Sequence, residues 1–384
     1  MKPLTILYLH YHDAPYRNPT LEILRKDPAF ERFETAVMFP VDKGHSYWGL
    51  DYDEEGVISL GQQDNKGGRK WHSKIRDLLK KKRYDCVVGN GFYHYTSLYL
   101  LLNAWLRRIP IVFISDNVSS TNWGNLKRWT EHCKIRVLGK ICRCFWVPGA
   151  SASAYLETYG RISKDRIFHG AYTMETSDLL ANYQQALAHR DAFRAELGIS
   201  AKDRVYLMAA NFIPNRQHGL LVEAFARLHE QDAHVQLVLL GEGDEQQEVR
   251  KRVESLGVSH AVHFIGGVSF DDLAHYYSAC DFYVHSGVEP YSTAVMYGAV
   301  VGKPIVASKA IGAVDDVLVD GENGYIFEPE CVDSACGALL KTNSLHSEQI
   351  IEMGERSKEV SSFYCPDWAA RQLVAAIKAA VWKN

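Results

Sequence analysis

The sequence predicts an α/β protein of two doubly wound domains, each a parallel sheet that is covered by helices on both faces. Its 384 residues are too many for one ordinary core, because a single domain holds about 150 residues. Short apolar runs alternate with helix-length segments, and nearly continuous apolar runs are typical of strands buried on both faces. A polar, helix-prone stretch at residues 170–203 divides these runs into two equal sets.

The apolar runs are the strands that we expect in the two sheets. Ligands of doubly wound sheets bind beyond the carboxyl ends of the strands, so we expect the functional site in a cleft between the domains. The first sheet is expected to contain residues 4–9, 35–39, 86–89, 109–114 and 144–147, and the second residues 205–209, 235–240, 262–265, 282–285 and 304–307.

Composition and charge narrow the class of protein. A hydrophobic share of 47% and a charged share of 23% are typical of a globular protein, and a net charge of −3 argues against a nucleic-acid binder. No apolar run reaches the roughly 18 residues that span a bilayer. Residues 1–5 lead directly into an apolar run, so we expect no signal peptide and a cytoplasmic start. The eight cysteines form no paired CxxC pattern, so we expect reduced thiols and no zinc site.

Two segments of the first half are rich in basic residues. Residues 69–83 carry eight basic side chains against one acid, Asp77. Residues 123–146 interleave basic with apolar side chains, a pattern typical of a helix that lies on anionic lipid. We therefore expect peripheral attachment to the inner face of a membrane; a solvated helix face is the alternative. The residues concerned are Lys127, Arg128, Lys134, Arg136, Lys140 and Arg143, with Trp123, Trp129, Leu138, Ile141 and Phe145.

Residues 286–308 carry the main functional signal. An apolar strand ends at His285, a loop with Glu289 and Pro290 follows, and a helix of small residues opens near Ser292. The first turn of such a helix presents free backbone N–H groups and the positive end of the helix dipole, which suits a diphosphate. Glu289 precedes this turn and is placed to accept hydrogen bonds from sugar hydroxyl groups.

This segment resembles the donor-binding signature of the retaining GT-B glycosyltransferases of family 4. In that family a Glu-Pro-Tyr/Phe-Gly loop is followed by a second Glu, and later by Gly-Lys/Leu-Pro and a strand. Residues 239–243, 264–268, 312–317 and 320–327 are also similar, so the resemblance covers most of residues 203–330. It implies a GT-B fold, with two Rossmann-like domains facing each other across a cleft. It further implies sugar transfer with retention of configuration and without a metal or other cofactor.

The resemblance also implies which residues bind the donor. Glu289 would contact the hydroxyl groups of the donor sugar, and the backbone of the following loop would contact the phosphates. Arg216 stands where the family has a phosphate-binding lysine, and an arginine can grip phosphate bidentately. The expected donor-binding residues are Asn211, Arg216, Gly241, Gly243, Gly266, Gly267, Glu289, Tyr291, Ser292, Thr293 and Tyr297.

Two of these residues depart from the family pattern. Tyr297 stands eight residues after Glu289, where the family has the second Glu that holds the donor ribose. A tyrosine hydroxyl cannot accept two hydrogen bonds as a carboxylate does. Asn211 replaces an arginine that meets the diphosphate. The ribose contact is therefore expected to be weaker or differently organised, or else the protein no longer turns over substrate.

The first half supplies further candidates at the ends of its strands. Asp116 follows a strand, at a place where the family often has a His or Asp near the reacting sugar; a helix N-cap is the alternative. We expect Asp116 to act in catalysis together with Glu289 and Arg216. The residues expected to contact the acceptor are His12, Asn90, Tyr93 and His94.

The resulting hypothesis is a two-domain sugar transferase of surface polysaccharide or lipopolysaccharide synthesis. Residues 200–364 would bind the donor, with a UDP-sugar expected, and residues 176–199 would connect the domains. Residues 1–175 would bind a glycan or lipid-linked acceptor, together with about 365–384, because this tail resembles the family's last helix, here anchored by Trp368. The alternatives are a catalytically impaired binding or scaffold protein, and a nucleotide-sugar epimerase, for which no acid/base set is found.

Overall fold

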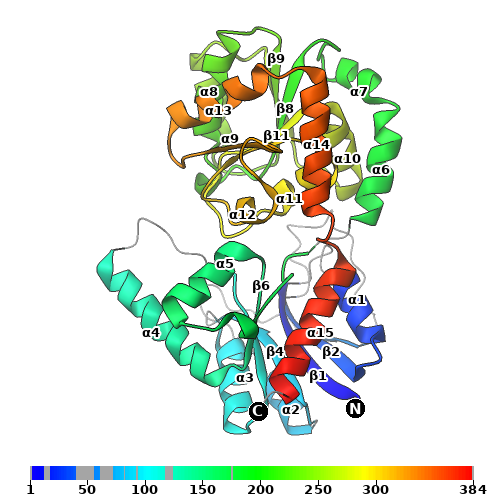
Figure 1. Ribbon diagram of the computed structural model, residues 1–384, viewed down its shortest axis with the longest axis vertical. Coiled ribbons are helices and arrows are strands. Elements are labelled where there is room, and N and C mark those ends of the chain that lie inside the picture. The colour runs from blue at the N-terminus through cyan, green and yellow to red at the C-terminus, as the bar shows by residue number, and fades with distance from the viewer. Residues whose placement is uncertain are drawn as a thin grey trace. The chain divides into compact units, whose positions relative to one another are not determined.

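The computed structural model describes residues 2–12, 18–39, 56–60, 72–81, 83–91, 94–116, 124–173 and 176–382. The chain divides into two compact units. The N-terminal unit comprises Met1–Glu175 together with Tyr364–Asn384, and the C-terminal unit comprises Thr176–Phe363. Each unit has a parallel sheet between layers of helices, so the predicted architecture of two doubly wound domains is confirmed (Figure 1).

The N-terminal sheet contains, among the described residues, seven strands in the order β3-β2-β1-β4-β5-β6-β7. Each of the five predicted apolar runs forms one of its strands. The two additional strands, β3 and β7, are only three residues long and lie at the edges of the sheet. The strands are β1 (Leu4–His12), β2 (Phe30–Phe39), β3 (Val57–Ser59), β4 (Cys86–Asn90), β5 (Ile111–Ile114), β6 (Cys144–Val147) and β7 (Ile167–His169).

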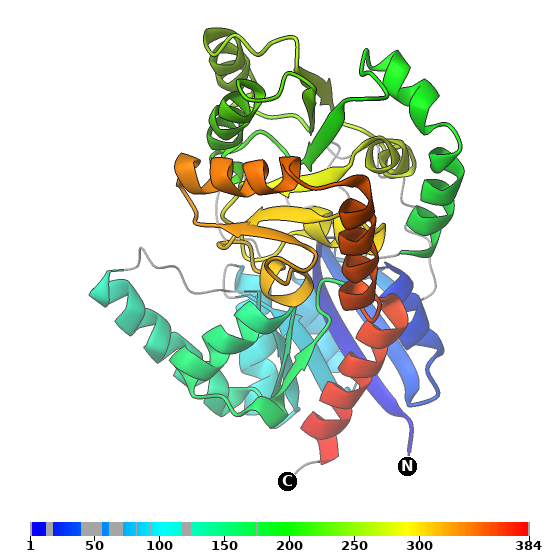
Figure 2. The same cartoon turned by 45° about the horizontal axis from the view of Figure 1, so that its top comes forward.

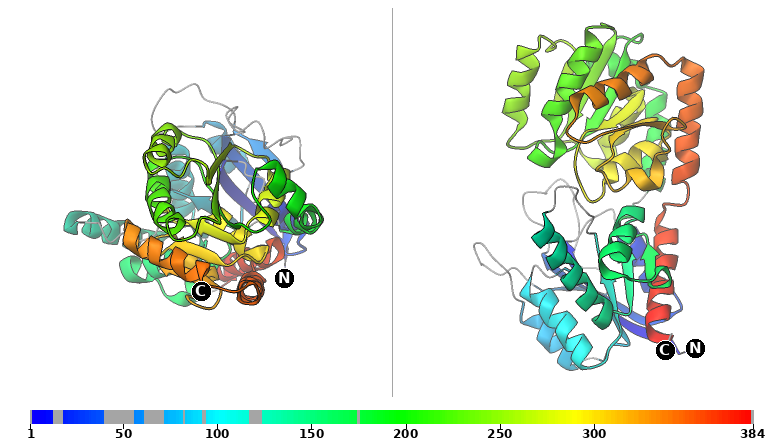
Figure 3. Two further views of the ribbon diagram at one scale, coloured as in Figure 1. Left: turned by 90° about the horizontal axis from the view of Figure 1, so that it is seen from above. Right: turned by 60° about the vertical axis from the view of Figure 1, so that its left-hand side comes forward.

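Helices cover both faces of this sheet because successive side chains of a strand point to opposite faces. On β1, Leu7 and Leu9 pack with one set of helices, whereas Ile6 and Tyr8 pack with the other. The right-hand view of Figure 3 shows the second set's last helix, in red, along one side of the strands. The first set is α2 (Lys74–Lys81), α3 (Tyr95–Leu106), α4 (Asn125–Ile141) and α5 (Ala150–Tyr155), and the second is α1 (Asn18–Lys26) and α15 (Pro366–Trp382).

The last helix, α15, belongs to the N-terminal unit although it follows the C-terminal unit in the chain. Small side chains allow it to approach the sheet closely: a Cβ atom on Gly170 would lie 3.0 Å from Cα of Ala369. Trp368 packs at the border of the same core, with its ring centre 5.1 Å from that of Tyr364. The chain's tail therefore returns to the first unit, as its resemblance to the family's last helix implies.

The C-terminal sheet contains, within the described part of the chain, six strands in the order β10-β9-β8-β11-β12-β13. Each of the five predicted runs again forms a strand, and the additional β13 lies at an edge. The strands are β8 (Arg204–Ala209), β9 (Val235–Leu240), β10 (Val262–Gly266), β11 (Phe282–His285), β12 (Ile305–Ser308) and β13 (Gly324–Phe327).

Helices also flank both sides of this second sheet (Figures 1 and 2). Residues 176–199 were expected to connect the domains, but they form α6 and α7, which pack on α10 within the C-terminal unit. On one side lie α8 (His218–His229), α9 (Gln246–Ser255) and α13 (Val332–Asn343). The remaining helices are α6 (Ser177–Leu187), α7 (Arg190–Glu196), α10 (Phe270–Ala279), α11 (Thr293–Val300), α12 (Val314–Val317) and α14 (Ser347–Ser361).

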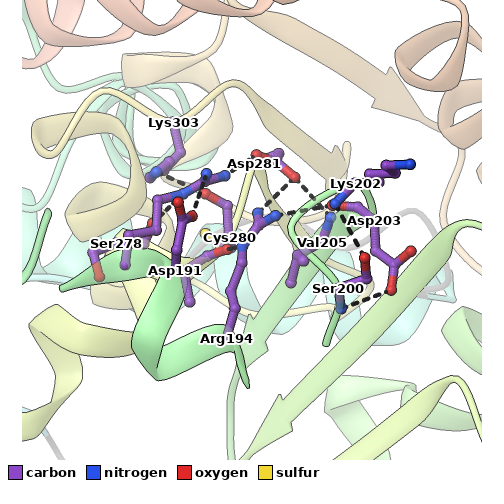
Figure 4. Close-up of polar contacts among 12 residues, drawn as sticks. Asp191, Arg194, Ser200, Lys202, Asp203, Val205, Ser278, Cys280, Asp281 and Lys303 are labelled. Atoms are coloured by element: carbon purple, nitrogen blue, oxygen red, sulfur yellow. Dashed lines mark hydrogen bonds and ion pairs between the residues drawn. The ribbon is translucent and has the colours of Figure 1, made fainter. Parts of the chain in front are cut away.

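A buried arginine fastens α7 to the sheet (Figure 4). The side chain of Arg194 is 1% exposed and donates hydrogen bonds to the carbonyl oxygens of Ala279 at 2.8 Å and Asp203 at 2.9 Å. It also binds one carboxylate oxygen of Asp281 at 2.9 Å, while Arg190 binds the other at 2.6 Å. A buried charge is stable only where such partners surround it. This network therefore fixes α7 at the N-terminal end of β11, which Asp281 directly precedes.

Lys303, in the Gly-Lys-Pro turn, strengthens the same region (Figure 4). Its Nζ donates a hydrogen bond to the carbonyl oxygen of Cys280 at 2.7 Å and lies 5.3 Å from the ring centre of Tyr183 on α6. Its own carbonyl oxygen accepts a hydrogen bond from Ser357 of α14 at 2.8 Å. The lysine of this turn thus joins α6 and α14 to the sheet, which is a packing reason for its presence.

We expect the substitution Arg194→Met to lower the free energy of unfolding of the C-terminal unit by about 3 kcal/mol, because two carbonyl groups and Asp281 lose a buried partner. Arg190→Met is the matched control: its side chain is 30% exposed, and its loss should cost about 1 kcal/mol or less. Urea unfolding followed by circular dichroism measures both. Equal losses would contradict the role assigned to Arg194.

Candidate functional site

The candidate site lies where the strand order of the C-terminal sheet reverses. β8 and β11 are neighbours at the centre of the sheet, although β9 and β10 lie between them in the chain. At such a switch point the loops after the two central strands diverge, and ligands of doubly wound sheets commonly bind there. The loops are residues 210–217 after β8 and residues 286–292 after β11.

Hydrogen bonds join these two loops directly. The backbone N–H of Val288 donates to the carbonyl oxygen of Asn215 at 2.7 Å. The hydroxyl of Ser286, which is fully buried, shares its one proton between the carbonyl oxygens of Arg216 at 2.8 Å and Gln217 at 3.0 Å. Gln217 has a left-handed backbone, with a φ of 54°, at the point where α8 begins. The backbone of Arg216 is therefore held against the loop that carries Glu289.

The carboxylate of Glu289 is buried between side chains from both loops, and only 6% of it is exposed. Its Oε2 forms an ion pair with Nη1 of Arg216, and its Oε1 lies 2.9 Å from Nε2 of His285. Burial by itself raises the pKa of this carboxyl group, but the contacts with His285 and Arg216 outweigh burial, so the pKa lies below its ordinary value. Glu289 is therefore ionised at neutral pH and can only accept hydrogen bonds.

The contacts around this carboxylate are short, but some of its hydrogen-bonding positions are not filled. Among the described residues, neither Oε1 of Glu289 nor Nη1 of Arg216 has a hydrogen bond of good alignment, although both atoms are buried. Buried polar atoms without such bonds are costly, and they favour a ligand that supplies them. Arg216, which was expected to meet the diphosphate, here faces the carboxylate that was expected to meet the sugar.

His285 was not among the predicted site residues. It is the last residue of β11 and is 1% exposed, and its Nδ1 accepts a hydrogen bond from the backbone N–H of Gly287 at 3.1 Å. An Nδ1 that accepts carries no proton, so the neutral ring carries its proton on Nε2, the atom that faces Glu289. A histidine that ends an apolar strand looks in sequence like a core residue. The only sequence signal is its position four residues before Glu289.

The helix that follows Glu289 begins where the sequence predicts. Ser292 is its N-cap: the hydroxyl oxygen accepts a hydrogen bond from the backbone N–H of Val295 at 3.5 Å, and Thr293 is the first helical residue. Ser292 is buried, and the Tyr291 hydroxyl lies 3.5 Å from Sδ of Met296. The first turn of α11 thus presents its backbone N–H groups directly after the carboxylate, as an anion site requires.

Tyr297, expected to take part in ribose binding, lies inside the C-terminal unit. Only 6% of the residue is exposed, and its ring packs edge to face against Phe270 of α10 at a centre distance of 5.5 Å. A buried glutamate at this place would need charged partners. The aromatic pair gives a packing reason for a tyrosine here.

Two glycines of the donor-binding set let the loops after β8 and β9 touch. Gly241 has a φ of +121°, and a Cβ atom on it would lie 2.2 Å from the carbonyl oxygen of Ala210. Gly243 has a φ of +151°, and a Cβ atom on it would lie 2.4 Å from the carbonyl oxygen of Phe212. No other residue fits either position without moving the backbone. These glycines therefore set the path of the loop that continues to Arg216.

The remaining donor candidates lie around the same loops. Asn211 is exposed in the loop after β8. The backbone N–H of Gly267 donates to a carboxylate oxygen of Glu242 at 3.4 Å, and Gly266 has a left-handed backbone with a φ of +96°. The ring of Phe212, fully buried, stacks on the buried His218 at a centre distance of 4.1 Å. Apart from Thr293 and Tyr297 on α11, the sequence-predicted donor residues thus lie in the loops that follow β8, β9 and β11, or at the end of β10.

The predicted residues of the first half belong to the N-terminal unit. Asp116 is exposed after β5 and accepts a hydrogen bond from the Tyr172 hydroxyl at 2.8 Å. The next described helix, α4, has Gly124 at its N-cap position. Asn90 ends β4, and its Oδ1 is buried without a hydrogen bond to a described residue. The positions of the acceptor set are as follows: His12 ends β1, the buried His94 precedes α3, and Tyr93 lies outside the described residues.

The second basic segment forms α4 and β6, and the structure divides its side chains into two groups. Leu138 and Phe145 are buried in the N-terminal core, so they are not part of a lipid-facing surface. Lys127 and Lys134 pair with the buried Glu131; burial raises the pKa of that carboxyl group, but the bonds to the two lysines and Tyr155 lower it to about 2. The exposed group comprises Leu126, Arg128, Trp129, Arg136, Val137 and Lys140. None of the described helices is both long and apolar enough to cross a bilayer.

The two parallel sheets with their helices have the GT-B fold, in which two Rossmann-like domains are joined. Residues 189–357, which lie within the C-terminal unit, match the family model of the group 1 glycosyl transferases. The lipopolysaccharide core biosynthesis glycosyltransferase LpsE of Rhizobium meliloti is 31% identical over 170 residues, which are 43% of this chain and 47% of LpsE. The chain thus spans about half the length of this curated relative.

Two solved structures share the fold along nearly the whole chain. HepE of Anabaena, in complex with UDP-glucose, matches with a TM-score of 0.69 over 96% of this chain and 98% of HepE, at 15% identity. A glycosyltransferase of Rickettsia africae matches with a TM-score of 0.73 over 100% of both chains, at 14% identity. At identities this low, a structural match shows the fold alone. The two matches confirm the predicted GT-B fold.

We expect Gly241→Ala to lower the free energy of unfolding by about 3 kcal/mol, because the new methyl group meets the carbonyl oxygen of Ala210 and the backbone is strained as well. Gly257→Ala is the control, since Gly257 also has a positive φ, +72°, but open space around it. It should cost about 1 kcal/mol, the strain alone. Urea unfolding compares the two variants, and equal losses would show that the contact with Ala210 is unimportant.

Proposed function

We propose that this chain is a retaining glycosyltransferase that moves a sugar from a nucleotide-diphosphate sugar to a glycan or lipid-linked acceptor in surface polysaccharide synthesis. One observation carries the proposal: the ionised carboxylate of Glu289 is buried at the switch point, next to Arg216 and the first turn of α11. The carboxylate can accept hydrogen bonds from the hydroxyl groups of a sugar, and Arg216 and the helix N-terminus complement the negative charge of a diphosphate. The similarity to LpsE, a lipopolysaccharide core enzyme, supports the same class of acceptor.

The proposed chemistry centres on the leaving nucleoside diphosphate. Its developing charge would be stabilised by the backbone N–H groups of Ser292 and Thr293 and by the guanidinium of Arg216, without a bound metal. Glu289 would hold the donor sugar by its hydroxyl groups. A UDP-sugar is the donor that we propose, in line with the UDP-glucose bound to HepE. Such preorganised donors are the main catalytic device of sites in which charge moves to a leaving group.

The N-terminal unit would bind the acceptor. We assign Asp116 to a polar contact near the reacting sugar and assign Asn90 and His94 to the acceptor. The buried Oδ1 of Asn90, without a hydrogen bond to a described residue, suits a hydroxyl donor of a glycan. With retention of configuration, attack takes place on the face from which the diphosphate leaves, and the departing phosphate can take the acceptor proton.

The second candidate is a catalytically impaired protein that binds a nucleotide sugar or serves as a scaffold. The packing of Tyr297 against Phe270 favours it, because the place of a ribose-binding carboxylate is occupied by an aromatic pair. The two candidates differ in turnover and not in donor binding. Release of nucleoside diphosphate from a bound donor, with or without an acceptor, separates them.

We expect calorimetric titration with UDP-, GDP- and dTDP-sugars to show binding of one nucleotide class, UDP first, with a dissociation constant of about 1 μM to 1 mM. Arg216→Gln should weaken nucleoside diphosphate binding about tenfold or more, because a charge-assisted contact is lost. Arg227→Gln is the control, since Arg227 is a half-exposed arginine of α8 that pairs with Asp333.

The outcomes of this titration are distinct. If no nucleotide sugar binds the wild-type protein or raises its melting temperature, the proposed function is wrong. Binding of a donor that is never hydrolysed or transferred favours the impaired alternative.

The exposed face of α4 supports a further part of the proposal, attachment to an anionic membrane surface. Leu126 is 76% exposed, Trp129 63% and Val137 59%, and Arg128, Arg136 and Lys140 are exposed on the same helix. On α3, which packs on the same face of the sheet, Leu102, Trp105 and Leu106 are at least half exposed. Exposed apolar side chains beside cations complement the headgroups and acyl region of anionic lipid.

We expect the wild-type protein to sediment with vesicles that contain phosphatidylglycerol and much less with phosphatidylcholine alone, and salt should weaken the binding. The double substitution Leu126→Gln and Trp129→Gln should reduce binding about tenfold, because it removes the apolar area that enters the interface. Ile351→Gln, at a 64% exposed position of α14, is the control. Equal binding to both lipids, or an unaffected double variant, would argue against this surface.

A further inference from the structure

The carboxylate of Glu289 has two supports of different kinds. Arg216 comes from a loop, its side chain is 23% exposed, and its Nη1 lacks a well-aligned hydrogen bond to a described residue. His285 is 1% exposed and belongs to a strand in the middle of the sheet. Arg216 can therefore turn to another anion, whereas His285 cannot leave.

The ring of His285 is held in one orientation. The backbone N–H of Gly287 donates to its Nδ1 at 3.1 Å. A Cβ atom on Gly287 would lie 2.8 Å from Cε1 of His285 and 3.0 Å from the carbonyl oxygen of Asn215, so the glycine is required for this turn to close on the ring. Held in this way, the neutral ring keeps its protonated Nε2 2.9 Å from Oε1 of Glu289.

We propose that His285 is the positioning residue of Glu289, and that it keeps the carboxylate directed at the donor sugar when Arg216 turns to the diphosphate. This inference rests on the proposed function. It explains why one contact comes from a rigid strand and the other from a loop. It also explains why the 2.9 Å contact is not yet well aligned, since hydrogen bonds of catalytic sites often tighten only when the substrate is bound.

The bonding capacity of the carboxylate agrees with this division. A carboxylate offers about four acceptor positions, of which His285 and Arg216 face one oxygen each. When Arg216 turns to the diphosphate, Oε2 becomes available to the sugar hydroxyl groups while Oε1 stays bound to His285. Because the ring is neutral, Glu289 keeps a full negative charge for those hydroxyl donors, which a protonated histidine would partly neutralise.

Two substitutions separate the two functions of the His285 ring. In His285→Gln, the amide nitrogen can take the place of Nε2 and donate to Glu289, but the bond from Gly287 is lost. In His285→Asn, the amide oxygen can take the place of Nδ1 and accept from Gly287, but the contact with Glu289 is lost. Affinity for UDP and for the UDP-sugar is measured by calorimetry, and kcat and KM are measured on the same samples.

We expect His285→Asn to bind UDP like the wild-type protein, but to lose about tenfold in its preference for the UDP-sugar over UDP, and at least as much in kcat. His285→Gln should recover most of that loss. The reverse order, with Asn active and Gln inactive, would show that His285 only supports the turn at Gly287. Two variants with the wild-type preference would overturn the inference and leave the proposed function intact. A wild-type protein that binds no UDP-sugar would instead overturn the proposed function.

A second measurement applies if either variant fails to fold. Long-range nitrogen–proton spectra of wild-type protein that carries ¹⁵N-histidine report the tautomer of each ring. We expect a neutral His285 with its proton on Nε2, whose signal shifts on addition of the UDP-sugar and less on addition of UDP. A proton on Nδ1, or the same response to both ligands, would overturn the inference.

Discussion

A carboxylate that is removed from water must have donors close to it, and this requirement governs the C-terminal site. The donors that face Glu289 are Arg216 and His285, which lie far apart in the chain. They meet because the strand order reverses between β8 and β11, so that the loops of two distant segments lie side by side. Ser286 then bonds to the backbone of the Arg216 loop, and Gly287 closes the turn on the histidine ring. The strand order, the hydrogen bonds between the loops and Gly287 thus all contribute to placing donors beside the Glu289 carboxylate.

Much of the fold could be predicted because strands that are covered on both faces leave long apolar runs in the sequence. Each of the ten predicted runs is a strand, but β3, β7 and β13 were missed. These lie at sheet edges, where three or four residues suffice and the apolar signal is short. Residues 176–199 look like a connection in the sequence because their polar composition hides the buried Arg194, whose partners Ala279 and Asp281 are distant in sequence.

Prediction of the site was less complete, because a sequence motif gives the position of a functional residue in the chain but not the side chains that contact it in space. The places of Glu289 and of the helix that starts after Ser292 follow from the sequence. That Arg216 faces Glu289 does not, since it depends on which loops the sheet order brings together. His285 ends an apolar strand as a core histidine would, and only its place four residues before Glu289 distinguishes it. In the basic segment at residues 123–146, the alternation of basic and apolar side chains does not show which apolar ones are buried: Leu138 is buried, whereas Trp129 is exposed.

The place of α15 has a consequence for how the chain acquires its structure during synthesis. One face of the N-terminal sheet, with Ile6 and Tyr8, is covered by α15, whose buried residues extend to Ala380. A ribosome makes about 5 to 20 residues per second, so the whole C-terminal unit is made before this cover exists. For that time the part of this apolar face that α15 covers is open to other nascent chains and to chaperones, while α1 can cover the rest. The first unit to be made is thus the last to be completed.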